Sequence, residues 1–233
     1  MPTNLRISLT ILTVGFAVEG AGEAYSLLTA GSFLPGTSLI FLFPAVITLL
    51  GLLFILIGRH EWDELHQSRV RRANVTFGLS VFAGVIAALE VGFLAYYPGI
   101  GTPLWAEILF GTAVGAFLLG TFITYSQLVF HLVSRPSKGA LIAASLWALI
   151  VSAYVGQALG ADLPAILGLI ATRSFSIDSL VAPVDYLASF LFLSYFLLLI
   201  AYLDAHIAVA RGRPPKRVAR VAPMAPPPSS SSK

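Results

Sequence analysis

The sequence predicts an all-α polytopic membrane protein: an integral membrane helix bundle of six transmembrane helices with a cytoplasmic N-terminus and C-terminus. Its 233 residues are 57% hydrophobic and only 11% charged, whereas soluble domains are roughly 25% charged. The apolar residues also form continuous blocks of about 20 or more, the length that a helix needs to cross a hydrocarbon core of roughly 30 Å. Both observations place the chain in a lipid bilayer, in a cell membrane.

The apolar blocks define six predicted spans within a transmembrane domain of residues 1–210. Residues 161–182, before the last span, contain an apolar piece too short to cross, so we expect an interfacial or re-entrant segment on the outer side. The tail, residues 211–233, is basic and then rich in proline and serine, which predicts a disordered cytoplasmic segment. The predicted spans cover about residues 7–30, 37–56, 75–97, 104–133, 140–159 and 183–208.

The positions of lysine and arginine predict the orientation of the spans. With the N-terminus inside, Arg6, the charged segment 58–74, Arg135, Lys138 and the tail all lie on the cytoplasmic side. This one-sided distribution follows the positive-inside rule, and only Arg173 lies outside. We expect the charged segment to form a short cytoplasmic helix or elbow between the second and third spans.

Small residues recur at four-residue spacing on the fourth and fifth predicted spans. Such faces allow helices to approach closely. They predict packing within the bundle, or contacts in a homo-oligomer or a larger membrane complex. The residues are Gly111 and Gly115 on the fourth span, and Ala144, Ala148, Ser152 and Gly156 on the fifth.

Four glutamates form the main candidate site, a cation- or proton-binding site in the outer half of the membrane. Glu19 and Glu23 are four residues apart and share a helix face, about 18 and 24 Å from the cytoplasmic end of their span. Glu90 reaches a similar predicted depth on the third span, and Glu107 stands near the outer end of the fourth, at the mouth of the site. Ionisable groups inside a membrane are costly, and by default they indicate function.

The alternative is that these glutamates are hydrogen-bonded structural residues or line a shallow hydrated vestibule. In the functional interpretation, Tyr25, Tyr96 and Tyr97 would line the entrance. A bound proton or cation would relieve the repulsion between Glu19 and Glu23, which lie one helical turn apart.

The stretch HEWDELH, residues 60–66, carries the residue types of a metal site without its geometry. Its histidines, His60 and His66, are six apart and lie about 240° from each other on a helix, unlike the HExxH zinc signature. We expect no metal there. Asp204, with His206 at the end of the last span, is expected to anchor the helix end.

The basic tail is predicted to bind anionic lipid headgroups at the cytoplasmic face or an acidic surface on a partner protein. The basic residues flank apolar spans, so nucleic acid is not an expected partner. No nucleotide-binding, hydrolase or zinc-protease signature is present, and no cofactor is implied. Three hypotheses remain: a small cation- or proton-linked transporter or channel, a non-catalytic accessory or scaffold subunit of a larger membrane complex, and a membrane enzyme. The basic residues of the tail are Arg211, Arg213, Lys216, Arg217 and Arg220.

Overall fold

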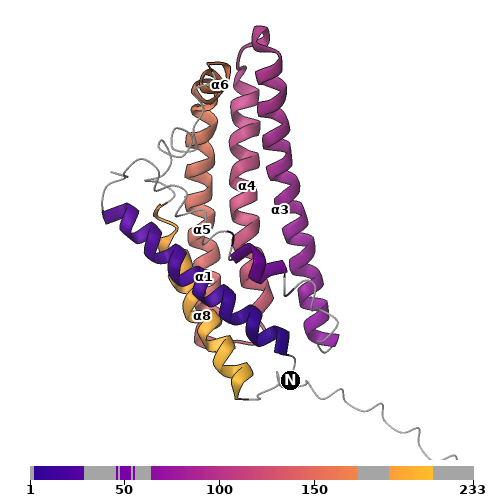
Figure 1. Ribbon diagram of the computed structural model, residues 1–233, viewed down its shortest axis with the longest axis vertical. Coiled ribbons are helices and arrows are strands. Elements are labelled where there is room, and N and C mark those ends of the chain that lie inside the picture. The colour runs from indigo at the N-terminus through magenta and orange to yellow at the C-terminus, as the bar shows by residue number, and fades with distance from the viewer. Residues whose placement is uncertain are drawn as a thin grey trace, which may run out of the picture.

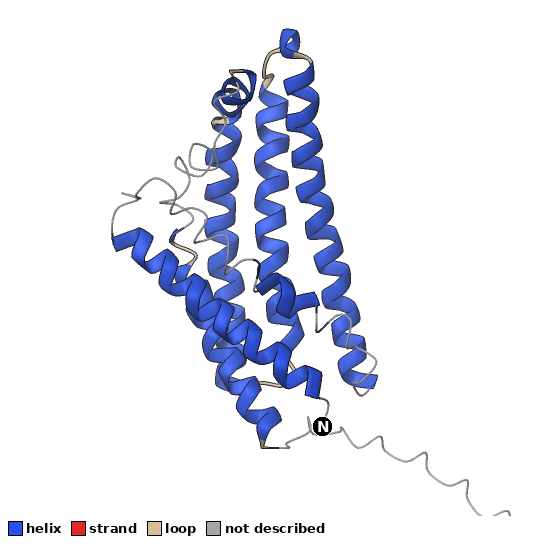
Figure 2. Cartoon of the chain, viewed as in Figure 1, coloured by secondary structure: helices blue, strands red, loops and turns tan. Residues whose placement is uncertain are grey.

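The computed structural model describes residues 3–28, 46, 48–53, 55, 64–172 and 189–211, and their regular structure is helical throughout (Figures 1 and 2). This confirms the all-α prediction for that part of the chain. Residues 46, 48–53 and 55 are also helical, within the second predicted span. The elements are α1 (Thr3–Leu28), α3 (Glu64–Tyr96), the 3-10 helix η2 (Pro98–Ile100), α4 (Leu104–Val129), α5 (Arg135–Ala161), α6 (Leu163–Ala171) and α8 (Phe192–Ala210).

Five of these helices, α1, α3, α4, α5 and α8, are long and apolar enough to cross a membrane. Their outward faces carry large apolar side chains; Leu79 on α3 and Leu104 on α4, for example, are 65% and 70% exposed. A surface of this kind is stable against lipid and unfavourable in water. The chain therefore has the helices of a membrane protein. The count of six spans and the orientation of the termini stay predictions, because residues 29–45 and 173–188 lie outside the described residues.

Three helices begin earlier than the apolar pattern predicts, and α1 does so by four residues, at Thr3. α3 begins at Glu64, so residues 64–74 of the charged segment form its first turns in place of a separate elbow. α5 begins at Arg135, with Pro136 in its first turn, where a missing backbone N–H costs no hydrogen bond. Arginine, glutamate and glutamine are good helix formers, and a helix continues past the hydrocarbon layer wherever the local sequence allows it. Hydropathy detects only the apolar part.

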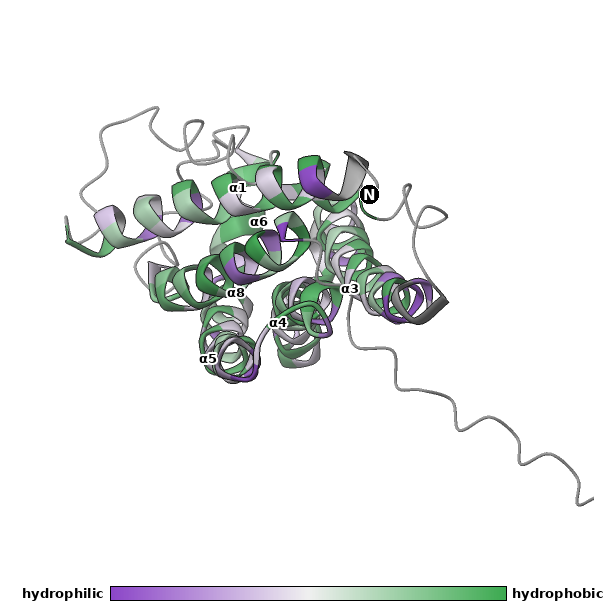
Figure 3. Ribbon diagram, turned by 90° about the horizontal axis from the view of Figure 1, so that it is seen from below, coloured by the Kyte–Doolittle hydropathy of each residue, from purple (hydrophilic) through white to green (hydrophobic). Residues whose placement is uncertain are grey.

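The helices form two groups that cross each other (Figures 1 and 3). α3, α4 and α5 stand side by side, with α4 packed against both of its neighbours. α1 and α8 pair with each other and lie obliquely across one side of this row, where α8 packs on α5. The ribbons are predominantly apolar in all five helices (Figure 3).

The short helix α6 follows α5 directly at the end of the bundle farthest from the N-terminus (Figure 1). Its nine residues are too few to cross a membrane, as expected for the segment 161–182. Leu163 and Ile166 are buried in a cluster with Ala106 and Phe110 of α4. α6 therefore covers the end of the α3–α4 pair.

The glycines of α4 and α5 allow these two helices to touch through their backbones. A Cβ atom at Gly156 would collide with the carbonyl oxygen of Gly111, and one at Gly115 would come within 3.0 Å of the carbonyl oxygen of Ser152. The small-residue faces predicted from the sequence thus pack against each other within the chain.

Candidate functional site

Glu19 lies in the most developed polar site among the described residues. Its half-buried side chain leaves α1 toward the helical residues 48–53, where the hydroxyl of Thr48 donates a hydrogen bond of 2.9 Å to Oε1. The side chain of Tyr195 on α8 also lies close enough to this carboxylate to interact with it. Tyr125 on α4 in turn lies next to Thr48. We call Glu19, Thr48, Tyr125 and Tyr195 the Glu19 site; it joins four helical segments.

Aromatic rings pack against the tyrosines of the Glu19 site. The ring of Phe16, one turn before Glu19, packs edge-on against Tyr125 at 5.0 Å and against Tyr202 at 4.9 Å between centroids. The hydroxyl of Tyr202 donates a 2.9 Å hydrogen bond to the backbone carbonyl of Tyr125, which joins α8 to α4. Phe16 and Tyr202 are completely buried. The carboxylate thus stands over a packed aromatic layer that fixes the tyrosines around it.

A close approach of α1 and α8 makes this arrangement sterically feasible. Gly20 follows Glu19, and a Cβ atom there would stand 3.3 Å from Cβ of Tyr195. Glycine at this position lets the backbone of α1 come near enough for Tyr195 to reach the carboxylate. Glu23, half-buried one turn further on, also acts electrostatically on Tyr195. The structure therefore brings Glu19 and Glu23 to the same tyrosine.

Glu90 lies elsewhere, between α3 and α4. Hydrogen bonds from Thr76 to Gln127 and between Ser80 and Thr121 show that the two helices are antiparallel, which puts Glu90 opposite the region of Phe110. Fifteen residues of α4 separate that region from Tyr125 at the Glu19 site, about 22 Å along the helix axis. Glu90 and Glu19 do not share one site in this structure. α1 crosses the bundle obliquely, so each of its residues advances less along the bundle axis than a residue of an upright helix does.

The surroundings of Glu90 are unusual for a carboxyl group. Its side chain is only 8% exposed, and neither oxygen has a hydrogen-bond partner in the part of the chain that the structure describes. The neighbours on its helix face, Ala87 and Leu94, belong to the apolar cluster that α6 covers. A buried carboxyl without partners is a costly arrangement.

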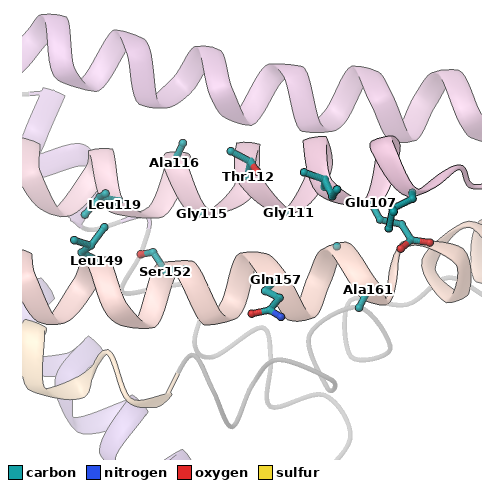
Figure 4. A pocket seen from close by; sticks show the side chains of 14 residues that line it. Glu107, Gly111, Thr112, Gly115, Ala116, Leu119, Leu149, Ser152, Gln157 and Ala161 are labelled. Carbon is teal, nitrogen blue, oxygen red and sulfur yellow. The ribbon is translucent and has the colours of Figure 1, made fainter.

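Glu107 occupies the first turn of α4. It lies at the same end of the bundle as Glu90 of α3, but on the side of α4 that faces α5 (Figure 4). It lines a groove of about 550 Å³ between α4 and α5, together with polar side chains such as Thr112 and Gln157. The predicted entrance tyrosines are separate from this groove and from the Glu19 site. Tyr96 and Tyr97 pack edge to face at the exposed end of α3, and Tyr25 is 59% exposed on α1.

The remaining predicted polar positions are partly outside the described residues. His60, Arg213, Lys216, Arg217 and Arg220 lie outside them, and Arg211 caps the end of α8. Among the described residues, no group of three or more His, Cys, Asp or Glu side chains could hold a metal ion. Asp204 accepts a 2.7 Å hydrogen bond from the backbone N–H of Ser134 and thereby ties α8 to the connection between α4 and α5.

Sequence reasoning missed the partners of Glu19, namely Thr48, Tyr125 and Tyr195. The available signal was their position: each is a hydroxyl-bearing residue inside an apolar span. Their convergence depends on the crossing of α1 and α8 over α4, which no single span reveals. Comparison with models of protein families, with curated proteins and with solved structures finds no match to this chain, so its function is inferred from the geometry alone.

Proposed function

We propose that this protein is a small cation- or proton-linked membrane transporter or channel in which Glu19 is the binding carboxylate. The observation that carries the proposal is the convergence of Thr48 and Tyr195 on the Glu19 carboxylate, from two segments other than its own helix. Both partners are neutral hydroxyl groups, so these contacts do not form a structural ion pair.

The chemistry of the Glu19 site suits reversible binding of a proton or cation. An ionised carboxylate at a helix centre costs about 2.5–3.5 kcal/mol, and a bound cation or proton offsets that cost. Hydroxyl groups adapt to either state, because a hydroxyl both donates and accepts hydrogen bonds. A change in occupancy at Glu19 would alter the hydrogen bond that holds α1 to Thr48 and the interaction of Glu19 with Tyr195 on α8. Binding would thereby be coupled to the arrangement of the helices.

The test is ion flux through purified protein in sealed lipid vesicles, followed with an internal pH dye and with cation-sensitive dyes. Glu19→Gln keeps the size of the side chain and an oxygen that can accept from Thr48 but removes the ionisable group, and we expect it to lower the flux at least tenfold. Thr48→Val should lower the flux and Thr48→Ser, which keeps the hydroxyl, should retain it. Flux through Glu19→Gln vesicles equal to that of the wild type, or wild-type flux equal to that of protein-free vesicles, would contradict the proposal.

A second candidate function, an accessory subunit of a larger membrane complex, is supported by one face of α3. The span Gln67–Tyr96 has the smallest buried share of the five candidate spans, 17%. Gly78 and Gly92 lie fourteen residues apart near one face of it, both exposed, and no described atom lies within 4 Å of a Cβ placed at either glycine. Small residues in line on a membrane helix are typical of packing against another helix. Extraction in native lipid discs would reveal a stable larger assembly that Gly78→Leu disrupts; a monomer would exclude this candidate.

A further inference from the structure

A second groove lies at the arginine-bearing end of the bundle, the end that the positive-inside prediction places at the cytoplasmic face. It has a volume of about 390 Å³ and is lined by α3, α4 and α5. Its polar rim includes Arg69 and Arg72 of α3 and Gln127 of α4, and its walls include Phe130, Ile142 and Leu146. We call this the arginine groove.

Among the residues that the structure describes, the charge of the arginine groove is positive and has no acidic partner. Arg69 and Arg72 are three residues apart and share a face of α3, and no ion pair involving either is present among the described residues. None of the lining residues is acidic. A third cation stands beside the groove, because Nζ of Lys138 lies 5.3 Å from the ring centroid of Phe130. A ligand held here would be an anion.

The groove also offers a neutral donor below the arginines. The side-chain oxygen of Gln127 accepts a 3.1 Å hydrogen bond from Thr76, which leaves the amide NH₂ group as a donor. Ser126 and Ser145 line the same groove, but their hydroxyl groups hydrogen-bond each other at 2.9 Å and the backbone carbonyl of Leu141, so the amide of Gln127 is the neutral donor for a ligand. Guanidinium and amide donors around one position suit the oxygen atoms of a phosphate.

The walls of the arginine groove continue as apolar surface toward the middle of the bundle. Leu146 lines the arginine groove, and Leu149, one helical turn later on α5, lines the groove that contains Glu107. The two grooves therefore run end to end along α4 and α5. From Phe130 to Leu119, where the second groove begins, α4 advances about 17 Å. That length is close to half of a roughly 30 Å hydrocarbon core, the depth of one leaflet.

We propose that the arginine groove binds one anionic phospholipid, whose phosphate contacts Arg69 and Arg72 and whose acyl chain runs along α4 and α5. Basic pockets between membrane helices on the cytoplasmic side recognise anionic headgroups in this way. The apolar surface that continues from the groove favours a lipid over a soluble phosphate, because a soluble phosphate has no apolar group to pack against it. The site is independent of Glu19 and of any transport activity.

The test uses the full-length protein in a neutral detergent, titrated with phosphatidylglycerol or with phosphatidylcholine. Bound lipid is counted by native mass spectrometry, and the midpoint of thermal unfolding is recorded. We expect one phosphatidylglycerol per chain and a rise in the unfolding midpoint that phosphatidylcholine does not produce. The double variant Arg69→Gln/Arg72→Gln should weaken phosphatidylglycerol binding at least tenfold, since each arginine contributes about 1 kcal/mol.

Arg71 provides the matched control, because it is exposed on the same helix and does not line the groove. Arg71→Gln should change the affinity less than twofold, whereas Ile142→Trp, which fills the apolar wall, should weaken binding with every arginine in place. Equal affinity for both lipids, an equal loss in Arg71→Gln, or a loss seen only on removal of residues 212–233 would overturn the proposal. So would inorganic phosphate that displaces the lipid and reproduces the shift in unfolding midpoint, since the site would then take free phosphate.

Discussion

Thr48 donates a hydrogen bond of 2.9 Å to Oε1 of Glu19, across 29 positions of the sequence. The bond joins the oblique helix α1 to the helical residues 48–53, and Thr48 in turn lies next to Tyr125 of α4. A hydrogen bond to a carboxylate is stronger than one between neutral groups. This contact therefore contributes both to the stability of the α1 packing and to the position of the carboxylate.

Replacing Thr48 by valine should measurably destabilise the fold. The substitution keeps the shape of the side chain and removes the donor, so we expect a loss of about 1.5–3 kcal/mol, the usual contribution of a hydrogen bond to a charged group. The free energy of unfolding in detergent measures it. Thr10→Val is the control: Thr10 donates only to the backbone of its own helix, at Arg6, in an exposed position, and its loss should cost far less. Equal losses of unfolding free energy in Thr48→Val and Thr10→Val would show that the hydrogen bond to Glu19 does not contribute to stability.

Gly156→Ala should force α4 and α5 apart. The new Cβ would collide with the carbonyl oxygen of Gly111, a backbone atom that cannot move aside alone. We expect a destabilisation of about 1–3 kcal/mol, as for other overpacked interfaces. At Gly139, on the same helix, no described atom lies within 4 Å of the position that a Cβ would take, so Gly139→Ala should be neutral or stabilising by up to about 1 kcal/mol. Thermal unfolding of the two variants side by side distinguishes packing from a general effect of alanine.

Tyr202→Phe isolates the hydrogen bond beneath the Glu19 site. It removes one hydroxyl from a completely buried ring and leaves the carbonyl of Tyr125 without that donor. We expect a loss of about 0.5–1.5 kcal/mol in the free energy of unfolding. Tyr154 is 61% exposed, and Tyr154→Phe should leave stability unchanged. A Tyr202→Phe variant as stable as the wild type would mean that α8 is not held to α4 by this bond.

Glu90→Leu should make the protein more stable. The wild-type carboxyl is buried without a hydrogen-bond partner among the described residues, and an apolar side chain of similar volume removes a desolvation cost of about 1–3 kcal/mol. Glu90→Gln keeps a buried polar group, so its gain in the free energy of unfolding should be smaller than that of Glu90→Leu. If Glu90 also serves ion binding, as the sequence suggested, Glu90→Leu will be more stable and less active in the same vesicle assay. A Glu90→Leu protein that unfolds more readily than the wild type would contradict this interpretation of the buried carboxyl.

The apolar pattern predicted where the membrane helices lie but not where they begin. α4 matches its predicted span closely, because apolar residues fill it and Pro103 stands directly before its first turn. α3 starts at Glu64 because a charged sequence of good helix formers carries no hydropathy signal and still forms helix. Of the short helix or elbow predicted at residues 58–74, residues 64–74 are helical but continuous with α3, and residues 58–63 lie outside the described residues.

The candidate site was predictable in its residue types and not in its geometry. Counting helical rise gave Glu19 and Glu90 a similar depth, which assumes upright helices. The inclination of α1 puts Glu19 beside Tyr125 near the end of α4, and Glu90 lies near the opposite end of that helix. Helix tilt is set by packing between helices, such as the close approach of Gly20 on α1 to Tyr195 on α8. A single sequence does not reveal which residues of different helices come into contact.

Infrared difference spectroscopy of the carboxyl groups tests the role of Glu19 most directly. The spectrum of the wild-type protein in lipid is recorded as pH, sodium or potassium is varied, and compared with that of Glu19→Gln. We predict a carboxyl band in the wild type that responds to a proton or to one of the cations and is missing from Glu19→Gln. Difference spectra that are the same in both proteins would contradict the proposed role, because Glu19 would then bind neither proton nor cation.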